Sequence, residues 1–401
     1  MGSKSVAMID AGRKPEPVVA FYNDPVIRGY IYQALVLVGV LLFAYWVFRN
    51  TAANLAAQNK TTGFDFLWGT AGFEVSFSLT GFGRASNYWQ AFLTGLVSTI
   101  LVAFISIIFA SIIGFTLGIA RLSNNWIISR LATVYVEVVR NVPLLLQLFV
   151  WYFAVLKAMP AVKQSLIFFG DWALNQRGLY VPRPLFDDRF NIVLLAIVLA
   201  IVGIFLVRRW ARQRLYATGQ QFPVLLTSLG LLIGLPLLGF LVSGTHVQFD
   251  LPVLQGFNYR GGMVLPPELV ALIVGLSLYH ATFIGETVRA GILAISHGQT
   301  EAADSLGLTS TQRLRLVIIP QAMRVIIPPL TSQYLNVTKN SSLGAAIGYP
   351  EFVAVFMGTS LNQSGRAIEI VSITMLVYLT LSLSTSALMN WYNARVALVE
   401  R

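Results

Sequence analysis

Lys339 is the ionisable residue of this chain whose surroundings most strongly suggest chemistry. It lies in a long apolar segment and is followed directly by Asn340, Ser341 and Ser342. Such a polar run can interrupt a helix and direct free backbone N–H groups at a carboxylate ligand. The alternative is that Lys339 extends toward water or caps the end of its helix. We favour a position near a translocation path, without requiring direct contact with a ligand.

Two further acid–base pairs lie within or beside apolar segments. Glu137 with Arg140, and Glu286 with Arg289, are each three residues apart and therefore share one helix face. An ionisable residue in a membrane span is costly and is a candidate for function. An ion pair on the surface of a helix explains both pairs equally well, so a role on the substrate path remains one of two interpretations.

Enzymatic motifs are absent from the sequence. It has no cysteine, and its histidines are only three and lie far apart, so we expect no metal site. Neither a Gly-x-x-x-x-Gly-Lys-Ser/Thr phosphate loop nor a Gly-x-Ser-x-Gly or His-Glu-x-x-His motif occurs. We therefore expect no catalytic residues and no nucleotide hydrolysis on this chain.

The elements that position these residues are long apolar helices. Of the 401 residues, 56% are hydrophobic and 11% charged, whereas soluble domains carry about 25% charged residues. A membrane span needs about 20 mostly apolar residues. The sequence predicts an all-α polytopic membrane protein with about eight spans, at residues 30–48, 91–120, 134–156, 192–207, 223–242, 269–288, 321–347 and 367–391.

The distribution of basic residues predicts the orientation of the spans. With both termini in the cytoplasm, the cytoplasmic segments hold more Lys and Arg than the outer ones, and the short "RRWARQR" stretch at 208–214 is the clearest case. The first apolar run follows a basic tail and is long enough to span, so we interpret it as an uncleaved first helix. The polar loop at 290–320 is then cytoplasmic.

This polar loop has the signals of two short helices lying at an angle. Glu301, Ala302 and Ala303 begin an amphipathic turn, Gly307 ends it, and Thr309 and Ser310 offer a new N-cap. Small residues here allow close approach of another protein. An ordinary pair of surface helices between two spans is the alternative.

Three stretches of the chain resemble one family of membrane proteins. "EAADSLG" followed by "LTSTQRLRLVIIP", together with "RNVPLLLQLFVWYF" and "PQAMRVIIPPLTSQYLNVTKNSSLGAAIG", resembles the permease subunits of ATP-binding cassette importers of the polar amino-acid branch. The resemblance implies that the loop couples the chain to a separate ATPase, through Glu301, Ala302, Ala303, Gly307 and Pro320. It also implies no cofactor on this chain, with ATP and Mg bound by the partner.

The chain is larger than the five-span permeases of that branch, and it is similar to one of the two permease subunits of general L-amino-acid importers. The expected parts are a cytosolic tail (1–29), an extra span and periplasmic loop (30–90), the first core part (91–157), an insert with two spans (158–266), the second core part (267–391) and a cytosolic tail (392–401). The outer loop of the insert contains the turn-forming residues Pro182 and Pro184. We interpret it as a connector between helices; the alternative is that it forms part of the docking surface for a binding protein.

The resemblance implies a transmembrane permease subunit that imports polar or a broad range of L-amino acids across the bacterial inner membrane. Its implied partners are ATPase subunits, a periplasmic amino-acid-binding protein and a second, smaller permease chain. An ion-coupled secondary amino-acid transporter is the alternative, with Lys339 and Glu286 as coupling residues. A membrane-embedded enzyme is a third, weaker hypothesis.

Three smaller signals concern packing. Gly114 and Gly118 predict close approach of another helix. Pro328 and Pro329 predict a kink in the seventh span. His280, alone in the sixth span, is interpreted as a hydrogen-bonded packing residue.

Overall fold

The computed structural model describes residues 25–57 and 63–396. The expected tails at 1–29 and 392–401 therefore lie largely outside the described residues. The chain separates into two compact units at residue 64. The first contains one described helix, α1 (Pro25–Ala57), and the second contains everything that follows.

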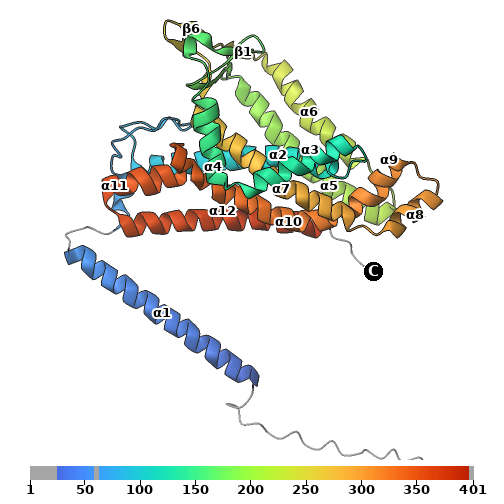
Figure 1. Cartoon of the computed structure of the whole chain (residues 1–401), viewed down its shortest axis with the longest axis horizontal. Helices are drawn as coiled ribbons and strands as arrows, with labels where there is room; N and C mark the ends of the chain where they lie inside the picture. The colour runs from blue at the N-terminus through green and yellow to red at the C-terminus, as the bar shows by residue number, and fades with distance from the viewer. Residues whose placement is uncertain (1–24, 58–62, 397–401) are drawn as a thin grey trace, which may run out of the picture. The chain divides into compact units, whose positions relative to one another are not determined.

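The expected number of spans agrees with the structure. Among the described residues, seven helices are long and apolar enough to cross a membrane, and a sharply bent helix pair makes up to eight. The long helices are α1, α2 (Tyr88–Ala120), α5 (Phe190–Thr218), α6 (Val224–Ser243), α7 (Pro267–Leu293), α10 (Ile319–Asn340) and α12 (Ala367–Val396). The expected all-α class is confirmed for the membrane part (Figure 1).

Helices α2 and α7 form the most extensive helix pair of the bundle, and glycine makes their contact possible. A Cβ atom on Gly114 would lie 2.6 Å from Ile284 Cγ2, and one on Gly118 would lie 2.7 Å from the carbonyl oxygen of Gly285. The close approach predicted from the Gly114–Gly118 spacing is thus present. Helix α10 packs on α7 and on α12, which completes the core.

The third span is broken in the middle. It consists of α3 (Trp126–Asn141), α4 (Leu144–Phe149) and the π-helical turn η3 (Val150–Leu156), with a bend of 104° between the two halves. The break falls at Pro143, which lacks an N–H donor and keeps the residue before it out of the helical region. Val142 accordingly has φ −98° and ψ 127°.

The seventh span is longer and more continuous than expected. Helix α9 (Ser310–Arg313), the π-helical turn η5 (Leu314–Ile318), α10 and the 3₁₀ turn η6 (Ser341–Ile347) form one span of 38 residues. The α-helix ends at Asn340, within the polar run after Lys339, and the chain continues there as a 3₁₀ turn. The span ends at Gly348, with φ 82°.

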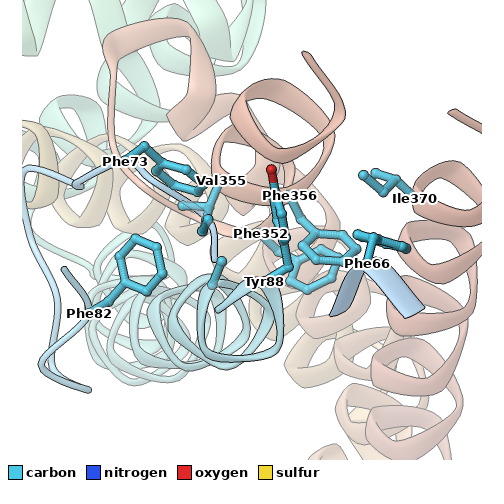
Figure 2. Packing of buried hydrophobic residues seen from close by; sticks show 10 residues of the cluster. Phe66, Phe73, Phe82, Tyr88, Phe352, Val355, Phe356 and Ile370 are labelled. Atoms are coloured by element: carbon cyan, nitrogen blue, oxygen red, sulfur yellow. The ribbon is translucent and has the colours of Figure 1, made fainter. Parts of the chain in front are cut away.

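A buried helical segment fills the interval between the seventh and eighth spans. The π-helical η7 (Val353–Ser360) and α11 (Leu361–Ser364) follow Gly348. Phe352 and Phe356 pack there with Tyr88 and with residues that precede α2, including Phe66 in the 3₁₀ turn η2 (Asp65–Trp68) (Figure 2). Residues 65–90, assigned from the sequence to a separate loop, are therefore packed against the core.

The insert folds as a hairpin of the two predicted helices, capped by small sheets. The sequence analysis missed the sheets. Helices α5 and α6 pack on each other and lead to strands at the top of the view in Figure 1. Strand β3 pairs with β8, so the two ends of the insert are joined. The strands are β1 (Leu166–Phe168), β2 (Trp172–Asn175), β3 (Gly178–Val181), β4 (Arg183–Leu185), β5 (Gln248–Asp250), β6 (Val253–Gln255), β7 (Asn258–Arg260) and β8 (Met263–Leu265), with the 3₁₀ turn η4 (Val162–Gln164) before them.

Candidate functional site

The loop between α7 and α9 contains one short helix, α8 (His297–Ser305), at one end of the bundle (Figure 1). Gly307 ends it with φ +73°, a conformation that favours glycine. Thr309 then caps the next helix: its backbone N–H donates to Gln312 Oε1 at 2.9 Å, and the Gln312 N–H donates to Thr309 Oγ1 at 3.4 Å. The stop at Gly307 and the cap at Thr309 were both predicted from the sequence.

Two details of the sequence interpretation of this loop are corrected. The second helix is the beginning of the seventh span rather than a separate short helix, because η5 and α10 continue it. Ala303 is only 2% exposed, so it packs within the chain and is not free for a partner. Pro320 lies in the first turn of α10, directly after η5, where its missing N–H is accommodated by the wider π turn.

Side-chain contacts tie α8 to the seventh span. Arg313 Nη1 donates to both carboxylate oxygens of Asp304, at 2.5 and 2.7 Å. The Gln321 amide donates to Gln299 Oε1 at 3.0 Å. Helix α8 is therefore linked to α9 and α10 by a salt bridge, a hydrogen bond and a short capped turn.

The exposed side of α8 is the part that another protein can reach. The Glu301 side chain is 70% exposed and its carboxylate lies 3.0 Å from His297 Nδ1. Ala302 is exposed, and a Cβ atom on Gly307 would meet nothing within 4 Å. Three of the predicted loop residues, Glu301, Ala302 and Gly307, thus form a small accessible surface.

A charged cluster joins the ends of α2 and α7. Glu286 accepts from Arg121, the C-cap residue of α2, and from Arg289 at 3.2 Å. The Glu286–Arg289 ion pair was one of the two interpretations of this spacing. Arg121 was missed, although its position directly after an apolar run was the available signal.

A cavity of about 510 Å³ is lined by one residue of each predicted pair. Arg140 from α3 and Glu286 from α7 both line it, with Pro329 and Gln333 from α10. The Arg140 guanidinium lies 5.1 Å from the centroid of the Phe283 ring. Within the described residues, Arg140 and Glu137 form no ion pair. The interpretation of their spacing as a helix-surface ion pair is therefore wrong. Both residues lie in the last turns of α3, near the break at Pro143.

The polar run after Lys339 is divided among three environments. Lys339 and Ser342 line a separate cavity of about 460 Å³ beside Tyr378 and Ser382 of α12. Asn340 lies 3.1 Å from His280 Nε2, which agrees with a packing role for that buried histidine. Ser341 is buried and its hydroxyl donates to the Thr338 carbonyl at 2.7 Å. The run therefore does not present one joint cluster of free donors.

Glu351 is a buried carboxylate that the sequence analysis did not single out. It accepts from the backbone N–H groups of Val353 at 2.8 Å and Ala354 at 2.7 Å, and from the Tyr378 hydroxyl at 3.1 Å. It thus caps the start of η7 and links it to α12. The sequence signal was an acidic residue directly after Pro350 and before an apolar run, which is typical of a helix N-terminus.

A multi-span bundle with charged side chains in largely apolar cavities, and an exposed helix between two spans, is an arrangement typical of membrane transport proteins. The family described as "Binding-protein-dependent transport system inner membrane component" matches residues 192–398. The chain belongs to this family of ATP-binding cassette importer permeases, as the resemblance of its motifs implied. The alternative of an ion-coupled secondary transporter is thereby excluded.

Relatives match over almost the whole chain. The "General L-amino acid transport system permease protein AapQ" of Rhizobium johnstonii is 52% identical and covers 94% of each chain. The "Putative amino-acid ABC transporter permease protein YhdX" of Escherichia coli is 49% identical, over 95% of this chain and 97% of that one. The "Glutamate/glutamine/aspartate/asparagine transport system permease protein BztB" of Rhodobacter capsulatus is 38% identical, over 94% and 96%.

Proposed function

We propose that this chain is the permease subunit of an importer that moves polar or a broad range of L-amino acids from the periplasm to the cytoplasm. The names of the three relatives support this substrate class: one is a general L-amino acid permease, one an amino-acid permease, and one takes acidic amino acids and their amides. The chain lies in the bacterial inner membrane with both termini in the cytoplasm. The basic residues at 208–214 and in the loop at 290–320 support this orientation.

The observation that carries the coupling mechanism is the exposed helix α8 fixed to the seventh span. Glu301, Ala302 and Gly307 contact a separate ATPase subunit, while Ala303 packs against the chain itself. Closure of the ATPases on ATP moves α8. The Asp304–Arg313 salt bridge carries this movement into α9 and α10.

Movement of the seventh span then changes access to the cavity at Arg140 and Glu286. An amino acid is a zwitterion, so its path needs a donor for the carboxylate and an acceptor for the ammonium group. Arg140 offers the first and Glu286 the second, and both line one cavity. Moving the equilibrium from 1:99 to 99:1 requires about 5.5 kcal/mol of preference for one state, which ATP binding supplies.

The other candidate residues are assigned by their surroundings. Lys339 and Ser342 offer a second polar surface facing α12, and Asn340 reaches His280. Ser341 is buried and bonded to its own helix, which supports a structural role. Arg289 and Glu137 flank the cavity residues in sequence, and we propose that they adjust its charge without contacting substrate.

The proposed partners follow from the family. ATP and Mg are bound by two ATPase subunits, a periplasmic binding protein delivers the amino acid, and a second, smaller permease chain completes the path. The sheets of the insert, on the side away from α8, are a candidate part of the outer surface that the binding protein meets. A simple connector role for these sheets remains the alternative.

The test is ATP-driven uptake of a mixture of radiolabelled L-amino acids by vesicles that contain the whole assembly. Glu301→Ala combined with Gly307→Asp is compared with Glu74→Ala, a control at another exposed glutamate. We expect the double variant to lose both uptake and retained ATPase subunits, and the control to keep both. Unchanged uptake in the folded double variant contradicts coupling through α8. Uptake of no amino acid by wild type contradicts the substrate class.

A further inference from the structure

The α5–α6 hairpin carries a concentration of positive charge that no acidic residue within the hairpin balances. Arg208, Arg209, Arg212 and Arg214 lie in the last three turns of α5, and no Asp or Glu occurs from residue 189 to residue 249. Such a block of arginines attracts an anion from outside the chain. Its role is not part of coupling or substrate binding as proposed above.

Two of these arginines line a cavity. Arg208 and Arg212 are four residues apart and share one helix face, and a cavity of about 430 Å³ lies in front of them. Neither makes a hydrogen bond or an ion pair with a described residue, so their donors are free. The cavity is also lined by Ala211, Leu215, Gln221, Phe222 and Val224, from α5 and from the turn into α6.

The turn that closes this cavity is held in place by the fourth arginine. Arg214 donates to Gln220 Oε1 at 2.8 Å and lies 5.4 Å from the centroid of the Trp210 ring. Trp210 in turn makes an edge contact with Phe222, with ring centroids 5.1 Å apart. The cavity therefore has a fixed wall and two free guanidinium groups.

The position of the cavity along the hairpin matches the boundary between lipid and water. The apolar part of α5 at 192–207 spans about 24 Å, and Arg208 is the first residue after it. Helix α6 begins its apolar part at Val224, which lines the same cavity. Leu225 and Leu226, directly beyond, are each 75% exposed and face the region of acyl chains.

We propose that Arg208 and Arg212 bind the phosphodiester headgroup of an anionic phospholipid, whose acyl chains lie along the start of α6. Guanidinium groups match the geometry of phosphate oxygens through paired hydrogen bonds. Basic pockets at the level of lipid headgroups favour lipids with net negative charge. The ammonium group of a zwitterionic lipid would be repelled by Arg208 and Arg212, and free phosphate lacks the acyl chains that the apolar rim accommodates.

The test measures phospholipid retained by the detergent-purified assembly, by mass spectrometry, after exchange into mixed micelles of phosphatidylglycerol and phosphatidylethanolamine. Wild type is compared with Arg208→Gln/Arg212→Gln and with Arg130→Gln/Arg209→Gln, which removes equal charge from exposed sites outside the cavity. We expect the first variant to retain about tenfold less phosphatidylglycerol and the control to resemble wild type. Single Arg212→Gln should give an intermediate loss.

Three outcomes overturn the proposal. Equal retention in wild type and the cavity variant would show that the lipid binds elsewhere, and an equal loss in both double variants would show only a general charge effect. Complete displacement of phosphatidylglycerol by inorganic phosphate at the same concentration would identify a simple anion site. Thermal unfolding of each preparation shows whether the compared proteins are folded. If Arg208→Gln/Arg212→Gln is not folded, the single variant Arg212→Gln takes its place in the comparison.

Discussion

The guanidinium of Arg121 donates directly to the carboxylate of Glu286, although the two residues are 165 positions apart in the sequence. This contact fixes the end of α2 to α7, one turn beyond Gly118, where the two helices pack closely. Glu286 also lines the cavity that contains Arg140. The contact therefore connects the packing of the bundle to the orientation of a candidate substrate residue.

Arg121→Gln is expected to destabilise the chain more than Arg289→Gln. The Arg121 side chain is 10% exposed, against 36% for Arg289. Losing the buried partner costs about 1–3 kcal/mol, whereas an exposed pair contributes about 0–1 kcal/mol. Thermal unfolding in detergent measures both variants. A larger loss for Arg289→Gln would contradict the assignment of Arg121 as the structural partner.

Gly118→Ala is expected to separate α2 from α7. The new Cβ atom would lie 2.7 Å from the Gly285 carbonyl oxygen and from Val288 Cβ, so the helices must shift at a cost of about 1–3 kcal/mol. Gly230→Ala in α6 is the matched control, because a Cβ atom there meets nothing within 4 Å. The control should be neutral or stabilising by up to about 1 kcal/mol. The measurement compares the thermal unfolding midpoints of Gly118→Ala and Gly230→Ala. Equal midpoints would argue against close packing at Gly118.

Glu351→Ala is expected to loosen η7 from α12. It removes the acceptor of two backbone N–H groups and of the Tyr378 hydroxyl, which should cost at least about 2 kcal/mol. Glu351→Gln keeps one acceptor oxygen and should lose less. Glu74→Ala breaks an exposed pair with Arg84 and should cost less than about 1 kcal/mol. Thermal unfolding of the three variants should rank them in this order, and a harmless Glu351→Ala would refute the capping role.

Asp304→Ala and Arg313→Ala are each expected to reduce ATP-driven uptake with little effect on stability. An exposed salt bridge contributes only about 0.2–1 kcal/mol to folding, but here it links α8 to the seventh span. The charge-swapped pair Asp304→Arg/Arg313→Asp should recover part of the uptake. ATP hydrolysis is measured on the same vesicles, so that a loss of coupling between hydrolysis and uptake can be distinguished from a loss of hydrolysis itself. If the swap recovers nothing while both single variants remain folded, the salt bridge is not the link.

Local sequence patterns were sufficient for the elements that depend on neighbouring residues. The apolar runs predicted the spans because a helix that crosses lipid must satisfy its backbone internally and expose apolar side chains. Gly307 and Thr309 predicted the end of α8 and the start of α9 because φ +73° and an N-cap are local requirements. The break in the third span follows in the same way from Pro143.

Contacts between distant segments were decided only by the tertiary structure. The residues around Arg121 do not show that its partner is Glu286, and those around β3 do not show that it pairs with β8 across the insert. The cavity at Arg140 likewise forms only where α3, α7 and α10 meet. Sequence by itself determined which segments cross the membrane and where the loop helix ends, whereas the start of that helix at His297 lies four residues before the expected Glu301. Packing determined which polar residues face each other, because side-chain burial depends on partners that lie far away along the chain.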